Sequence, residues 1–124
     1  MTMQGSIAAA RLSGPSLQPD GSVAFEFRFS ANDPVFAGHF PGHPILPGVF
    51  QLELARGAAE LALGGKLSVR EISKAKFQRP ILPDELVRVD LKFSEQDGSI
   101  RVRAGFSVGA QPAGETQILL WRND

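Results

Sequence analysis

Residues 48–63 read GVFQLELARGAAELAL, and this stretch decides the fold. It is rich in Ala, Leu, Glu and Gln, it follows Pro47, and it is stopped by Gly64 and Gly65, so we predict a helix over residues 48–63. Apolar side chains cover most of its circumference, and we therefore expect it to be buried on nearly every side. The rest of the chain has to wrap around it.

Strand patterns lie on both sides of this helix. In residues 22–30, SVAFEFRFS, apolar and polar side chains alternate with the period of a half-buried strand. A sheet curled around one helix would bury the apolar faces best, so we predict an α+β fold. The other strand candidates are residues 71–77, 86–93, 99–108 and 115–121, with a hairpin turn at 96–98, and residues 6–12 could form a further short strand.

Length and charge narrow the classes of protein. With 124 residues we predict a single domain, 1–124. The 13 basic and 13 acidic residues cancel and form no run, which argues against a nucleic-acid-binding or membrane-surface protein. No cysteine is present to form disulfides or act as a nucleophile. Residues 1–12 lack a signal-peptide pattern and no segment reaches the roughly 20 apolar residues of a membrane span, so we expect a cytoplasmic protein.

Residues 33–47, DPVFAGHFPGHPILP, form a proline-rich loop ahead of the helix, and three prolines at intervals of three predict a stiff, extended segment. The two histidines of the chain, His39 and His43, both lie in it. With a proline between them and no carboxylate cluster nearby, they do not predict a metal site. No Gly-x-Ser-x-Gly motif is present to suggest a serine hydrolase.

Glu53 lies about five residues inside the predicted helix, among apolar neighbours. Because burying an unpaired carboxylate is costly, such a group is usually paired, neutral or catalytic. An ion pair with Arg56, about one turn later, is the alternative to catalysis. Gly48 stands where the N–H groups of the helix lack partners and could stabilise a developing oxyanion, although it could also be only a turn into the helix.

Residues 36–53, FAGHFPGHPILPGVFQLE, resemble the signature of the 3-hydroxyacyl-[acyl-carrier-protein] dehydratases of the short, non-isomerising type. The resemblance includes the Gly-His-Phe-Pro loop, the Pro-Gly-Val start of the helix and the histidine-to-glutamate spacing. Residues 74–86, KAKFQRPILPDEL, resemble a second segment of the family. Membership would imply a hot-dog fold, in which an antiparallel β-sheet wraps around one long central helix.

The resemblance also implies an activity and the residues behind it. The protein would convert (3R)-hydroxyacyl thioesters to trans-2-enoyl thioesters in fatty acid or related lipid synthesis. His39 would be the base that removes the α proton, Glu53 the acid that assists departure of the hydroxyl, and the Gly48 N–H would polarise the thioester carbonyl. This chemistry needs no metal or organic cofactor, because the substrate is carried on the phosphopantetheine of acyl carrier protein.

Assembly and binding residues follow from the same resemblance. The family builds a dimer whose sites take histidine and acid from different subunits, which implies a homodimer or a dimer-based higher oligomer here. The acyl chain would enter a tunnel lined by Phe40, Pro47, Val49, Leu54 and Gly57. The acidic carrier would bind a basic cluster, although a solvated strand face explains the same residues, which are Arg70, Lys74, Lys76 and Arg79.

The helix departs from the family pattern after Glu53. Where the family commonly has a glutamine, this chain has Gly57, and Arg56 is new. Leu54 and Gly57 would reshape the helix surface near the tunnel, which favours a specialised pathway such as polyketide-like or aryl-polyene synthesis. Two alternatives stay open: a non-catalytic protein that binds acyl carriers or pairs with an active relative, and an acyl thioesterase.

Overall fold

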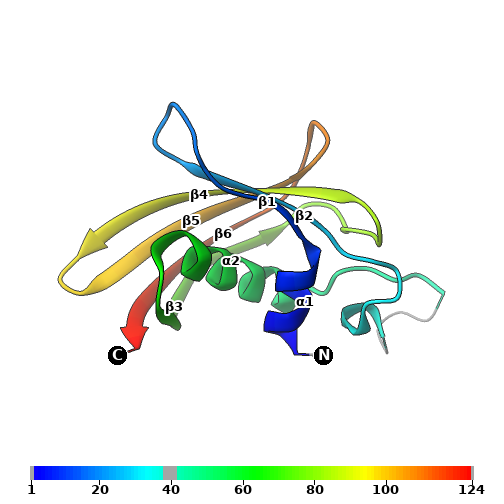
Figure 1. Cartoon of the computed structure of the whole chain (residues 1–124), viewed down its shortest axis with the longest axis horizontal. Coiled ribbons are helices and arrows are strands. Elements are labelled where there is room, and N and C mark those ends of the chain that lie inside the picture. Colours follow the sequence, from blue (N-terminus) through cyan, green and yellow to red (C-terminus); the bar gives the residue numbers. More distant parts are fainter. Residues whose placement is uncertain (1, 38–41, 124) are drawn as a thin grey trace.

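The computed structural model describes residues 2–37 and 42–123 and contains one six-stranded sheet. The strand order is β1-β2-β4-β5-β6-β3, and every neighbouring pair is antiparallel. The sheet curves around α2, with α1 beside it on the same side (Figure 1). The elements are α1 (Met3–Ala10), β1 (Arg11–Leu17), β2 (Val23–Arg28), the 3-10 turn η1 (Pro34–Phe36), α2 (Gly48–Leu63), β3 (Lys66–Phe77), β4 (Leu86–Gln96), β5 (Ser99–Val108) and β6 (Gln111–Asn123).

The central helix and the alternating strand confirm two predictions. Helix α2 has the bounds that the sequence predicts. The sheet wraps around this helix in the α+β arrangement expected for a hot-dog fold. Phe25, Phe27 and Phe29 are buried and stack along the strand. Phe29 meets Phe50 of α2 edge-on, with ring centroids 5.4 Å apart. The aromatic face of β2 is therefore the surface on which the helix packs.

The strand predicted for residues 6–12 is wrong. Residues 3–10 form α1, and only the last two of the predicted residues belong to β1. The Thr2 hydroxyl accepts a hydrogen bond from the Gly5 N–H at 3.0 Å and so caps the helix. Helix α1 buries Ser6, Ile7 and Ala10. Neither described helix is long and apolar enough to cross a membrane.

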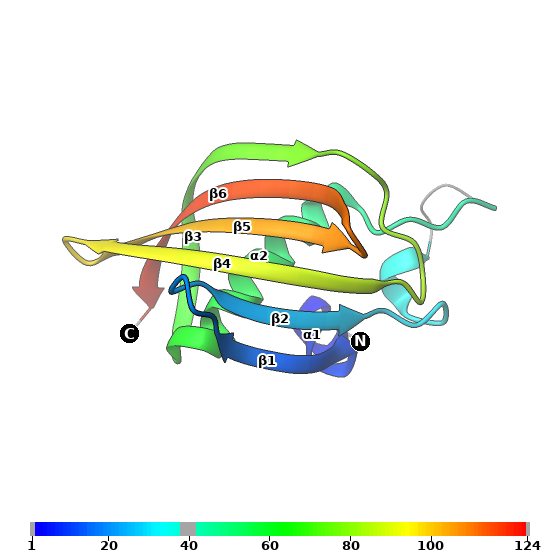
Figure 2. The same cartoon turned by 90° about the horizontal axis from the view of Figure 1, so that it is seen from above.

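Helix α2 is less enclosed than predicted. Its middle, from Leu54 to Ala59, is buried, but Val49 near its start is 69% exposed and Leu61 near its end is also exposed. Strand β3 lies at the edge of the sheet, as the view from above shows (Figure 2). The described chain therefore leaves both ends of α2 partly uncovered.

Candidate functional site

Two loops hold the start of α2: the one that precedes the helix and the one that follows β3. The Leu46 N–H donates to the Ile81 carbonyl at 2.8 Å, which ties the loop before the helix to the loop after β3. The Pro47 carbonyl accepts from the N–H groups of Phe50 and Gln51. No described residue accepts from the Gly48 N–H, which is one of the unpartnered donors of a helix N-terminus. This is the group that the sequence analysis proposes for a developing oxyanion.

Space around Gly48 is limited on one side and open on another. A Cβ at this position would lie 2.7 Å from Phe77 Cε2, so no side chain fits without a shift. A cavity of about 230 Å³ borders the same residue, and Gln51, Phe77 and Arg79 also line it. The glycine thus lets the chain enter the helix close to Phe77 while its backbone faces a cavity.

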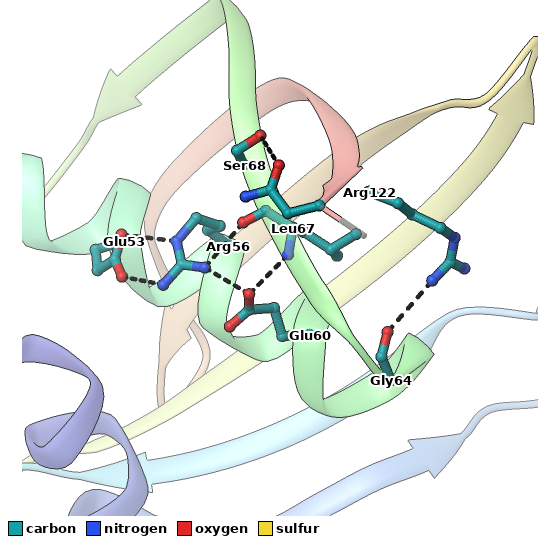
Figure 3. A network of polar contacts seen from close by, with 8 residues as sticks. Glu53, Arg56, Glu60, Gly64, Leu67, Ser68 and Arg122 are labelled. Carbon is teal, nitrogen blue, oxygen red and sulfur yellow. Dashed lines mark hydrogen bonds and ion pairs between the residues drawn. The ribbon is translucent and has the colours of Figure 1, made fainter.

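Glu53 follows Gly48 by about one and a half turns of α2 and forms an ion pair with Arg56 (Figure 3). Arg56 Nε donates to Glu53 Oε2 at 2.9 Å, and Nη2 donates to Oε1. The ion pair considered from the helical spacing is therefore present, and the catalytic role of Glu53 stays a prediction. Burial of the Glu53 side chain is only partial, at 20% exposed.

Arg56 has further partners that the sequence analysis missed. Its Nη1 lies 2.8 Å from Glu60 Oε2 and donates to the Leu67 carbonyl at 3.0 Å. The Leu67 N–H in turn donates to Glu60 Oε2 at 2.7 Å. Hydrogen bonding to Glu53 raises the pKa of Arg56 against the opposing effect of burial, so the guanidinium stays charged. The spacing of four residues could have identified Glu60 as a partner, but nothing local identifies Leu67.

His39 and Phe40 lie outside the described residues, so the pairing of His39 with Glu53 stays a prediction. His43, the other histidine, borders a separate open cavity of about 630 Å³ together with Ile45 and Leu82.

The other residues predicted to line an acyl tunnel do not share one surface. Pro47 is half-buried and Val49 is exposed at the start of α2. Leu54 is fully buried in the core, not on the helix surface that the sequence analysis expects. Gly57 is buried where α1 crosses α2, and a Cβ there would lie 3.0 Å from Ile7 Cδ1. Contact of these residues with an acyl chain stays a prediction.

Arg79, one of the four predicted carrier-binding residues, is already paired. Its Nη1 and Nη2 donate to the Glu85 carboxylate at 3.2 and 3.0 Å. Burial alone would raise the pKa of Glu85, but the hydrogen bonds from Arg79 and from the Leu82 N–H outweigh burial and hold this pKa below its ordinary value. Arg79 therefore stabilises the loop after β3.

The other three basic residues lie on β3. Lys74 Nζ is 3.3 Å from Glu115 Oε1 in an exposed ion pair. The guanidinium of Arg70 lies over the Trp121 ring, 4.5 Å from its centroid. Lys76 is exposed. The basic cluster in the sequence is thus partly neutralised in the fold, with Arg70 and Lys76 as the cations without a described carboxylate partner.

Sequence comparison finds similarity to known dehydratases. A family described as ApeI-like, ApeI dehydratase, matches residues 16–113. The chain is 37% identical over 111 residues to the 3-hydroxyacyl-[acyl-carrier-protein] dehydratase FabZ of Chloroflexus aggregans, covering 83% of this chain and 77% of that protein. It is 31% identical over 98 residues to the FabZ of Pelotomaculum thermopropionicum, covering 73% of this chain and 70% of that one.

Solved structures with the same arrangement confirm the hot-dog fold. One is the dehydratase heterocomplex ApeI:P from Xenorhabdus doucetiae, with a TM-score of 0.69 and 25% identity over 89% of this chain and 93% of that chain. Another is a protein from Erwinia carotovora subsp. atroseptica, with a TM-score of 0.72 and 27% identity over 91% of this chain and 95% of that chain.

Proposed function

Because the chain belongs to the ApeI-like dehydratase family, we propose that it removes water from 3-hydroxyacyl thioesters carried on acyl carrier protein, in fatty acid or related lipid synthesis. The product is the trans-2-enoyl thioester. The family match over residues 16–113 and the names of the similar proteins support this reaction.

The start of α2 is the observation that carries the proposal. Gly48 has an N–H without an acceptor in the described chain and borders a cavity. Glu53 lies further along the same helix and does not line this cavity. A thioester carbonyl that accepts a hydrogen bond from this N–H gains negative charge as the α C–H bond breaks, and the N-terminal end of the helix stabilises that charge.

Two proton transfers complete the reaction. His39 accepts the α proton, a C=C bond forms, and the Cβ–O bond breaks as Glu53 gives a proton to the departing hydroxyl, which leaves as water. His39 then loses its proton to solvent and Glu53 regains one. Because side chains carry both protons, the proposal includes no metal or organic cofactor, and activity should persist after dialysis against a chelator.

We propose that a second copy of the chain covers the open edge of the sheet. Val69 and Ile72 pair with Leu120 and Ile118, which are fully buried, and cross-strand partners share a face. Val69 and Ile72 are nevertheless 41% and 49% exposed, and they lie on β3, an edge strand of the sheet. Such an apolar edge is a surface for strand pairing.

In such a dimer, His39 of one copy would face Glu53 of the other, as the resemblance implies. Assembly with a related subunit is the alternative, since the solved ApeI:P structure is named a heterocomplex. The carrier would approach Arg70 and Lys76 on β3, and a cytoplasmic location is part of the same proposal.

A product assay tests the function. Purified protein, supplied with 3-hydroxyacyl carriers of several chain lengths, is expected to form enoyl thioester and water, detected by mass spectrometry. Glu53→Gln and His39→Ala should each lower the rate tens-fold, which is at least about 2 kcal/mol of transition-state stabilisation. Glu95→Gln, which changes an exposed carboxylate on β4, should leave the rate unchanged.

Other products would identify another function. Free acid would indicate a thioesterase, and carrier binding without any product would indicate a non-catalytic subunit. Full turnover in both Glu53→Gln and His39→Ala would refute the assignment of the two residues.

A further inference from the structure

Position 57 has no side chain to hold Glu53 from the next turn of the helix. It lies four residues after Glu53, where side chains on a helix meet. Helix α1 covers it, and a Cβ at Gly57 would lie 3.0 Å from Ile7 Cδ1. Among the described residues, the side chain that holds the Glu53 carboxylate is instead Arg56.

We propose that Arg56 is a positioning residue for dehydration, whose guanidinium holds the Glu53 carboxyl group in the orientation that meets the 3-hydroxyl of the substrate. The inference rests on the proposed function. Nε and Nη2 of Arg56 bind the two oxygens of Glu53 separately, which is the fork geometry that arginine forms with a carboxylate. Rotation of the carboxyl group would break both hydrogen bonds, so its plane is fixed.

The guanidinium is itself held from the opposite side. Nη1 of Arg56 lies between the Glu60 carboxylate on α2 and the Leu67 carbonyl at the start of β3. Because the Leu67 N–H also donates to Glu60, the three groups form a closed set of contacts that joins the helix to the sheet (Figure 3). The orientation of Glu53 is therefore fixed relative to the sheet and not only to its own helix.

This arrangement leaves the oxygens of Glu53 free to form a further hydrogen bond to the substrate. A carboxylate oxygen accepts two hydrogen bonds, and Arg56 takes one on each oxygen. When Glu53 carries a proton, its carbonyl oxygen still accepts from Arg56 while the protonated oxygen donates to the 3-hydroxyl. Glu60 shares the guanidinium, so one positive charge serves two carboxylates.

Replacing Arg56 by lysine tests the inference, because lysine keeps the charge and loses the fork. In the full-length protein, Arg56→Lys is expected to lower kcat about tenfold and to change KM by less than about twofold. In a Glu53→Gln background, the same substitution should change kcat by less than about twofold, because Arg56 acts through Glu53. Arg88→Gln, which removes an exposed arginine paired with Asp90 on β4, is the matched control.

The outcomes separate the inference from the proposed function. An equal loss of kcat in both backgrounds, or a change in KM alone, would overturn the role of Arg56 while leaving the dehydratase intact. A wild-type protein that forms no enoyl product would overturn both. If thermal melting shows that Arg56→Lys does not fold, Glu60→Gln replaces it: this variant weakens the anchor, and its smaller loss of kcat should likewise vanish in the Glu53→Gln background.

Discussion

Replacing Gly48 by alanine tests how the start of α2 is built. A Cβ at this position would lie 2.7 Å from Phe77 Cε2 and 3.1 Å from Cδ2 and Cζ. Carbon atoms pack best at about 3.5–4.0 Å, so the ring or the helix start must move by about 1 Å. The first movement changes only a side chain, whereas the second displaces the backbone N–H that is proposed to bind the substrate.

The size of the effect follows from the surroundings. Inserting a methyl group into a filled space costs about 1–3 kcal/mol, and replacing glycine by alanine in a helix returns about 0.5–1 kcal/mol. Phe77 is 47% exposed, so its ring takes up part of the movement and the helix start takes up the rest, which keeps the repacking cost near the lower end of this range. We expect Gly48→Ala to lower stability by about 0–2 kcal/mol and the melting temperature by about 0–8 °C.

The loss of activity in Gly48→Ala should be larger than its loss of stability alone would cause. A misplacement of about 1 Å can lower a rate about 100-fold, so kcat of Gly48→Ala is expected to fall about 10–100-fold in the enoyl-product assay. Phe77→Leu removes the ring that causes the clash, and in that background the loss from Gly48→Ala should shrink at least about threefold. Wild-type kcat in Gly48→Ala, or an undiminished loss in the Phe77→Leu background, would refute this account of the helix start.

Three further predictions concern the rest of the molecule. Ile72→Lys puts a charge on the apolar edge of β3 and should turn a dimer into a monomer in light scattering; an unchanged mass contradicts the proposed interface. Because the folded-state pKa of Glu85 lies below its ordinary value of 4.5, the contribution of Glu85 to stability should be fully present above about pH 4.5 and lost as the pH falls below that value. Melting curves of Arg79→Gln should therefore show a lower stability than the wild type at pH 7 and a smaller loss of stability on acidification. Lys76→Glu should raise KM for an acyl carrier, more strongly at low salt, and have little effect on a thioester without the carrier.

Features with local signals were predictable from the sequence. Helix α2 begins after Pro47 and ends at Leu63, just before Gly64, whose positive φ of 79° favours glycine, so composition and both boundaries agree. The alternating phenylalanines of β2 show the buried face directly, because strand residues two apart share a face. The ion pair of Glu53 and Arg56 was likewise predictable, because residues three apart on a helix lie on the same face.

Features that depend on distant contacts were not predictable. Residues 8–10 are alanines, which have no periodicity to distinguish strand from helix. Helix α1 forms with a cap from Thr2 and buries Ile7 against Gly57, 50 positions later in the chain. The same contact shows a feature of Gly57 that the sequence does not reveal: the absent side chain leaves room for Ile7 of α1, and its contact with a substrate stays a prediction.

Fold stability is a poor explanation for the charged cluster around Arg56. Taking charged groups out of water is costly, and apolar residues of similar volume often stabilise a fold as well as a buried ion pair does. Arg56 is only 9% exposed and its neighbours Ala55 and Ala59 are fully buried, so an apolar side chain at this position would extend an existing core. An apolar side chain could not, however, fix the plane of a carboxyl group. With no side chain at Gly57, this contrast supports the proposal that the cluster holds the Glu53 carboxyl group in place.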